Sequence, residues 1–87
     1  MKEIWKWSLG PETIIEIPVG AKILTVQEQY GEPKLWALID PTAAKESRRF
    51  LVYGTGHKIT EENGIYIGTF QLDNGYLVFH AFEYPIK

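Results

Sequence analysis

The residues best suited to binding or catalysis lie in the short segment Gly54-Thr55-Gly56-His57, which follows the strand-like run 49–53. Two glycines let the backbone adopt positive φ and turn successive N–H groups toward one point. An imidazole adds a donor that can change its charge near neutral pH. The segment therefore predicts a backbone nest for a small anion. A Gly-x-Gly between two strands is also plain turn chemistry, and that interpretation stays open.

Charged and aromatic side chains near this segment in the sequence would complete such a site. Arg49 shares the parity of Leu51 and Tyr53 along the expected strand, so its guanidinium is a candidate for binding phosphate. A solvated strand start near Glu46 is the plain alternative. Aromatic faces would stack on a base or ribose. We expect a small nucleotide-like anion to be bound by Arg49, Tyr53, Gly54, Thr55, Gly56, His57, Trp36 and Tyr66.

Motifs with a recognisable catalytic mechanism are absent from the sequence. It contains no Gly-x-Ser-x-Gly elbow, His-Glu-x-x-His pattern, Walker-type loop or Cys-x-x-Cys pair. The two histidines with a carboxylate would supply an acid–base pair, but a metal needs three or four converging ligands. On a strand, His80 is expected to form an ordinary hydrogen bond with Thr69. We expect no enzyme activity, metal or cofactor, and an enzyme acting through His57 or His80 is the third hypothesis.

Length and composition restrict the classes of protein that the chain can belong to. Its 87 residues predict one domain, 1–87, whose small core makes homo-oligomerisation favourable. The absence of cysteine excludes disulfides and thiolate sites and fits the cytoplasm. A net charge of -2 provides no basic field for general nucleic-acid binding. No apolar run is long enough to span a bilayer, so we expect a cytoplasmic protein without a membrane partner.

Apolar residues alternate with period two over most of the chain, which predicts an all-β fold. We expect a small antiparallel sandwich or partly open barrel of about seven strands, with at most one short helical turn. Segment 40–47 breaks the alternation and is expected to be a long connection. Residues 60–63 are expected to form one capped turn.

Two hairpins are predicted from their turn residues. Residues 22–30 and 34–40 are expected to pair around Gly31, at the first central position of a type II′ turn, with Leu24 and Val26 facing the core. Residues 65–72 and 76–83 flank Asp73-Asn74-Gly75, which favours a type I′ turn. That register places Phe70 opposite Phe79, Ile67 opposite Phe82 and Thr69 beside His80.

Five segments of the chain, residues 17–27, 35–41, 54–57, 66–71 and 77–83, together resemble a family of small uncharacterised proteins encoded by bacteriophages and prophages. The resemblance covers nearly the whole chain. It carries no activity and no residue roles. It implies a phage context, in which small accessory proteins block a host defence protein or sequester a nucleotide immune signal.

A module that binds another protein is the main alternative to ligand sequestration. It would inhibit a host defence protein or serve as a virion component. Its contact surface would be an open sheet edge or the aromatic side chains of Trp5, Trp7 and Tyr84.

Overall fold

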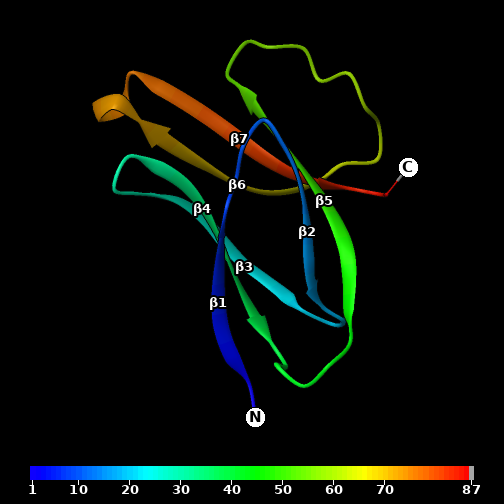
Figure 1. The fold of residues 1–87 in the computed structure, drawn as a ribbon. Helices are drawn as coiled ribbons and strands as arrows, with labels where there is room; N and C mark the ends of the chain where they lie inside the picture. The colour runs from blue at the N-terminus through cyan, green and yellow to red at the C-terminus, as the bar shows by residue number, and fades with distance from the viewer. Residues whose placement is uncertain (87) are drawn as a thin grey trace.

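The computed structural model describes residues 1–86, and these residues form seven strands in two antiparallel sheets, with no closed barrel (Figure 1). One sheet has the order β1-β4-β3 and the other the order β2-β5-β7-β6. The all-β prediction is therefore confirmed. The elements are β1 (Glu3–Ser8), β2 (Glu12–Pro18), β3 (Lys22–Gln29), β4 (Glu32–Ile39), β5 (Lys45–Gly54), β6 (Ile65–Leu72), the 3-10 turn η1 (Asp73–Gly75) and β7 (Leu77–Tyr84).

The hydrophobic core lies between the two sheets because alternate residues of each strand point inward. Leu35, Ala37 and Ile39 of β4 are fully buried on one side. Phe50 of β5 and Ala81 of β7 are fully buried on the other, in the same cluster. Burying a side chain the size of Phe50 contributes roughly 1.5–3 kcal/mol, so this cluster is the main source of stability.

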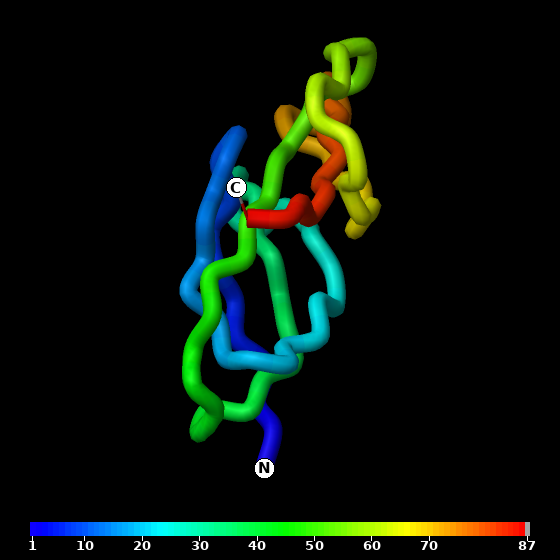
Figure 2. Tube along the Cα trace, turned by 90° about the vertical axis from the view of Figure 1, so that its right-hand side faces the viewer, coloured from blue at the N-terminus to red at the C-terminus, as the bar shows by residue number. Residues whose placement is uncertain are grey.

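Strand β5 connects the two halves of its sheet. Its residues 45–51 pair with β2, and its residues 49–54 pair with β7. Figure 2 shows it running along most of the length of the molecule, from the end near the N-terminus to the long loop that follows it. The last residues of β5 therefore lie against β7, and the long loop begins directly after them.

The predicted long connection at 40–47 is wrong in its second half, because β5 begins at Lys45. Residues 45–47 pair with residues 16–18 of β2. The chain reverses in the preceding residues, where Asp40 Oδ1 accepts hydrogen bonds from the N–H and the hydroxyl of Thr42, at 2.9 and 2.7 Å. An aspartate that bonds the backbone two residues on makes a compact turn. Residues 45–47 lie at exposed positions and are polar, so this part of β5 lacks the alternation of apolar residues that indicates a strand.

The hairpin of β3 and β4 differs from the prediction in its turn and in one core residue. Gln29 pairs with Glu32, so Tyr30 and Gly31 are the two central residues, with φ of 53° and 80°. Two positive φ values define a type I′ turn rather than type II′. A bulge between Ile23 and Thr25 turns Leu24 outward, so that Ile23 faces the core instead of Leu24.

The hairpin of β6 and β7 confirms most of the predicted register. Phe70 pairs with Phe79 and Thr69 pairs with His80. The predicted type I′ turn is also confirmed, because Asn74 and Gly75 have φ of 55° and 89°.

The first half of β6 departs from this register. A bulge between Tyr66 and Gly68 places Tyr66, instead of Ile67, opposite Phe82. An ideal Cβ on Gly68 would lie 3.1 Å from Cγ2 of Val26, so the bulged strand passes close to β3.

Residues 55–64 form an irregular loop between β5 and β6, and the predicted capped turn at 60–63 is absent from it. In Figure 1 this loop, coloured green to yellow, arches away from the end of β5 and returns beside β7. Gly64 lies so close to the ring of Tyr84 that an ideal Cβ would be 2.6 Å from Cζ. The end of the loop therefore covers part of the outer face of the sheet.

Candidate ligand-binding site

The candidate site lies on the outer face of the sheet β2-β5-β7-β6, where three strands run side by side. Tyr53 of β5 pairs with His80 of β7, which in turn pairs with Thr69 of β6. Paired residues share a face, so these three side chains form one row across the sheet. The long loop begins directly after this row, at Gly54.

The segment Gly54–His57 forms a tight turn at the end of β5. The N–H of His57 donates to the carbonyl oxygen of Gly54 at 3.0 Å, and Gly56 has φ of 88°, as the third residue of a type II turn requires. The N–H of Thr55 donates to the carbonyl oxygen of Val78 at 3.0 Å. Two of the N–H groups expected to face an anion are therefore occupied within the protein.

The imidazole of His57 folds back over Gly54. An ideal Cβ on Gly54 would lie 2.9 Å from Cε1 of His57, so the ring occupies the space that a side chain at position 54 would need. The two glycines thus have different roles. Gly56 permits the backbone turn, and Gly54 makes room for the ring.

His80 is held at both ring nitrogens by hydroxyl groups. Its Nε2 lies 2.7 Å from Oγ1 of Thr55, and its Nδ1 lies 2.9 Å from Oγ1 of Thr69. The hydroxyl of Tyr66 lies 2.6 Å from the same Thr69 oxygen. A continuous chain of hydrogen bonds therefore connects the glycine turn with the exposed side of β6. The predicted contact between His80 and Thr69 is confirmed.

These elements line an open hollow of about 180 Å³, the outer hollow, whose wall is mostly apolar and carries a few polar groups. Its wall includes an aromatic pair, in which the rings of Tyr53 and Phe82 meet edge to face with centroids 5.9 Å apart. Sequence reasoning placed five of the lining residues in the site and missed Ile59, His80 and Phe82 as members of it. The predicted register of His80 beside Thr69 was the available signal. The lining residues are Tyr53, Gly54, Thr55, Gly56, His57, Ile59, His80 and Phe82.

Arg49 does not line this hollow. Its Nε lies 2.6 Å from Glu12, and its two terminal nitrogens bind both carboxylate oxygens of Glu61. Hydrogen bonds that the guanidinium donates to Glu61 and then to Glu12 raise its pKa. The side chain is only 5% exposed and connects the long loop to the edge strand β2. Its charge, expected to meet a phosphate, is balanced by two carboxylates because the loop brings Glu61 over it.

Trp36 and Tyr84 also do not lie at the surfaces where the sequence predicts them. Trp36 is on β4 in the other sheet, where it lines a shallow outer groove with Leu24 and Thr25. Tyr84 is 4% exposed, and burial raises its pKa to about 12. The prediction that Trp5, Trp7 and Tyr84 form one contact surface is therefore wrong, because Tyr84 is buried on the outer face of the opposite sheet.

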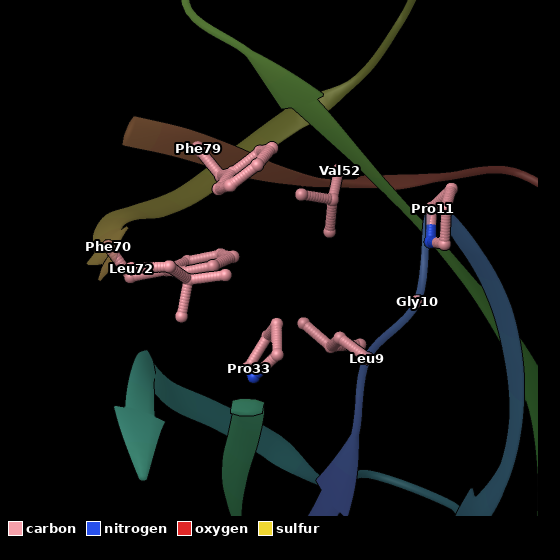
Figure 3. Close-up of a pocket in the computed structure, with 8 residues that line it drawn as sticks. All are labelled: Leu9, Gly10, Pro11, Pro33, Val52, Phe70, Leu72 and Phe79. Carbon is pink, nitrogen blue, oxygen red and sulfur yellow. The ribbon is translucent and has the colours of Figure 1, made fainter. Parts of the chain in front are cut away.

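A second hollow, which sequence reasoning missed, lies on the inner side of the same strands. It also measures about 180 Å³ and is lined almost entirely by apolar groups. Figure 3 shows these side chains arranged around an open space between the sheets. No local motif marks it, because its lining comes from five separate parts of the chain: Leu9, Gly10, Pro11, Pro33, Val52, Phe70, Leu72 and Phe79.

Within residues 1–86, no three histidine or acidic side chains are grouped so that they would hold a metal ion. The same part of the chain contains no helix of the length and apolarity needed to cross a membrane.

The fold and the site together define a small all-β protein of two antiparallel sheets with a small hollow on one outer face. Residues 1–87 match the model of a family described as a domain of unknown function (DUF7352), and the chain belongs to this family. No curated protein and no solved structure matches the chain. Membership of a family without an assigned function is confirmed, and the phage origin stays a prediction.

Proposed function

We propose that this is a binding protein whose outer hollow holds a small nucleotide-derived anion. The observation that carries the proposal is the meeting of two imidazoles and a threonine hydroxyl with the aromatic pair of Tyr53 and Phe82. Small-ligand sites combine apolar and aromatic walls with a few convergent polar groups. A planar heteroaromatic ring would pack against the aromatic pair while its polar edge meets the imidazoles.

The size of the hollow decides how such a ligand would be bound. At about 180 Å³ it is smaller than the 300–1,000 Å³ that encloses a typical drug-sized ligand. It would enclose a base or ribose and leave the phosphates at the mouth. The exposed side chain of His57 lines the hollow and keeps its proposed role as a phosphate contact, and Lys58, the next residue in the chain, takes the role proposed for Arg49. Gly56 contributes a backbone donor, and Tyr66 acts through Thr69 rather than by stacking.

The resemblance to phage-encoded proteins supports a biological context for this binding. Sequestration of a nucleotide immune signal in the host cytoplasm would need a protein that binds the signal and withholds it from its receptor. The proposed ligand class is the one that such a role requires. This part of the proposal rests on the resemblance and on no single residue.

The outer face of the sheet β1-β4-β3 favours a second candidate function, the binding of a protein partner or a second copy of this chain. Ile4 and Leu24 are 60% and 43% exposed and flank Trp36 in the shallow groove. Exposed apolar groups that cluster around an aromatic residue are typical of interaction surfaces. Sedimentation of the wild type and of Trp36→Ala would test self-association at this face.

The ligand proposal is tested by the melting temperature of the protein against nucleosides, mononucleotides and cyclic di- and trinucleotides. A ligand at a hundred times its dissociation constant stabilises the native state by about 2.7 kcal/mol. We expect one nucleotide class to raise the melting temperature, and His57→Gln to reduce the effect. Trp36→Ala, on the other sheet, is the matched control. A flat panel, or an effect lost only in Trp36→Ala, would overturn the assignment.

A further inference from the structure

The hydroxyl of Thr55 has two acceptors within reach, and their distances differ. Nε2 of His80 lies at 2.7 Å, and the carbonyl oxygen of Val78 lies at 3.3 Å. That carbonyl already accepts the backbone N–H of Thr55 at 3.0 Å. When Nε2 of His80 is the unprotonated nitrogen of the ring, it accepts the hydroxyl proton of Thr55 over the shorter of these two distances.

The second nitrogen of the His80 ring continues the chain of hydrogen bonds in the same direction. With Nε2 accepting, Nδ1 carries the proton and donates to Oγ1 of Thr69 at 2.9 Å. Oγ1 of Thr69 and the hydroxyl of Tyr66, 2.6 Å apart, share a further hydrogen bond in which either oxygen can be the donor. A hydroxyl within hydrogen-bond reach of an imidazole that a third group orients is the arrangement that activates a nucleophile.

The backbone around Thr55 also suits a nucleophile. The residue lies in a sharp turn directly after a strand, between two glycines, and its side chain is exposed. In the strand-to-helix elbow of hydrolases, the N–H of the residue after the nucleophile binds the oxyanion, and the turn after β5 offers the same position without a helix. That residue is Gly56, whose N–H has no backbone partner among residues 1–86. The imidazole of His57 is the next donor along the chain.

We propose that Thr55 is a nucleophile toward ester carbonyls, with His80 as its general base and Thr69 as the residue that positions His80. Oγ1 of Thr55 attacks the carbonyl carbon while Nε2 takes the hydroxyl proton. The bond to the leaving oxygen then breaks, and Nε2 returns the proton to that oxygen. The products are an acylated Thr55 and a free alcohol. Attack by water, assisted again by His80, releases the carboxylic acid and restores Thr55.

The neutral hydroxyl of Thr69 limits the reaction to reactive substrates. A carboxylate in this place would stabilise the imidazolium by its charge, which a hydroxyl lacks. The hollow is small, so the acyl group must be small as well. The substrate class is therefore an ester with a short acyl chain and a good leaving group. The inference goes beyond nucleotide binding and does not depend on it.

The test uses p-nitrophenyl acetate as the probe, with release of nitrophenolate and peptide mass mapping as the two measurements. We expect one acetyl group on Thr55 in the wild type and in Thr55→Ser, and none at this position in Thr55→Ala. His80→Gln should slow the acetylation of Thr55 by about 100-fold or more, as the loss of a general base does. Thr69→Val should slow it less, and Thr69→Ser should restore it.

Thr60→Ala, at an exposed threonine of the same loop that does not line the hollow, is the matched control, and His57→Gln shows how much ester is consumed by that imidazole itself. Acetylation of His57 or of lysines without acetylation of Thr55 would overturn the proposal, as would an unchanged rate in His80→Gln. If His80→Gln does not fold, judged by its melting curve, the pair Thr55→Ser and Thr55→Ala on the exposed turn decides. Nucleotide-dependent melting of the same samples shows whether the binding proposal stands or fails separately.

Discussion

The two hollows lie on opposite faces of strands β5 and β7, and they differ in the polar groups that they contain and in the elements that close them. Val52, Phe79 and Phe70 point inward and line the inner hollow. Tyr53 and His80, which neighbour Val52 and Phe79, point outward and line the outer hollow, where His80 is bonded to Thr69. Because successive side chains of a strand alternate between faces, one short stretch of sheet produces both environments.

The two hollows are closed by different elements of the fold. The inner one is bounded by the opposite sheet, through Leu9 and Pro33, so its walls belong to the core. The outer one is bounded by the turn Gly54–His57 and by Ile59 of the long loop. We expect changes in the inner hollow to alter the stability of the whole domain. Changes in the outer hollow should alter binding and local order.

The largest effect is expected from Phe70→Ala, which removes a wall of the inner hollow. Phe70 is 4% exposed and stacks on Phe79 with ring centroids 5.7 Å apart. Truncating a buried phenylalanine costs about 3–5 kcal/mol, to be measured by chemical denaturation. Thr69→Ala on the outer face is the control and should cost about 1 kcal/mol. Equal losses in the two variants would remove the distinction between the faces.

A smaller loss is expected from Gly64→Ala, at the end of the long loop. The new Cβ would lie 2.6 Å from the ring of Tyr84, which is buried and has little space to move. Overpacking of this kind costs about 1–3 kcal/mol, measurable from the shift of the denaturation midpoint. Gly10→Ala is the matched control, because its nearest contact would be an ordinary 3.8 Å. An unchanged midpoint in Gly64→Ala would show that the loop does not pack on Tyr84.

Tyr84 should make the outer face, unlike the inner one, sensitive to alkaline pH. Burial raises the pKa of its hydroxyl from 10.0 to about 12. The folded state then retains a proton that the unfolded chain loses. The contribution to stability is complete below pH 10 and is lost as the pH rises from 10 to about 12. Denaturation curves of wild type and Tyr84→Phe should converge over this interval, and parallel curves would contradict the assignment.

The smallest effect is expected from Val52→Ile, which adds one methylene to the inner hollow. The side chain keeps its β-branch and extends into an apolar space. Burial of one methylene contributes about 0.8 kcal/mol, so the melting temperature should rise. Val78→Ile on the outer face lines neither hollow and is the control. A lower melting temperature in Val52→Ile would mean that the hollow has no room for the added group.

The parts of the fold that depend on local residues were predicted well. The Asn74-Gly75 pair determines the turn and hence the register of β6 and β7, and this placed Thr69 beside His80. The bulges were not predictable in the same way. Leu24 and Ile67 fit the alternating pattern as written, and only contacts between the sheets decide where an extra residue is inserted.

The candidate site was predicted where its residues are neighbours in sequence and missed where they are not. Five expected residues around the glycine turn line one hollow. Arg49 was misjudged because its partners, Glu12 and Glu61, are 37 and 12 positions away. Parity along β5 indicates the face on which Arg49 lies, but it carries no information about the loop that folds over that face.

The sequence by itself determined the all-β class, the glycine turn and the register of the second hairpin. These follow from period-two alternation and from backbone preferences, which act within a few residues. Tertiary structure alone decided which charges are paired, which tyrosine is buried and which hydroxyls meet His80. Such contacts join segments far apart in the chain, and their partners are set by the packing of sheets and loop rather than by local preference.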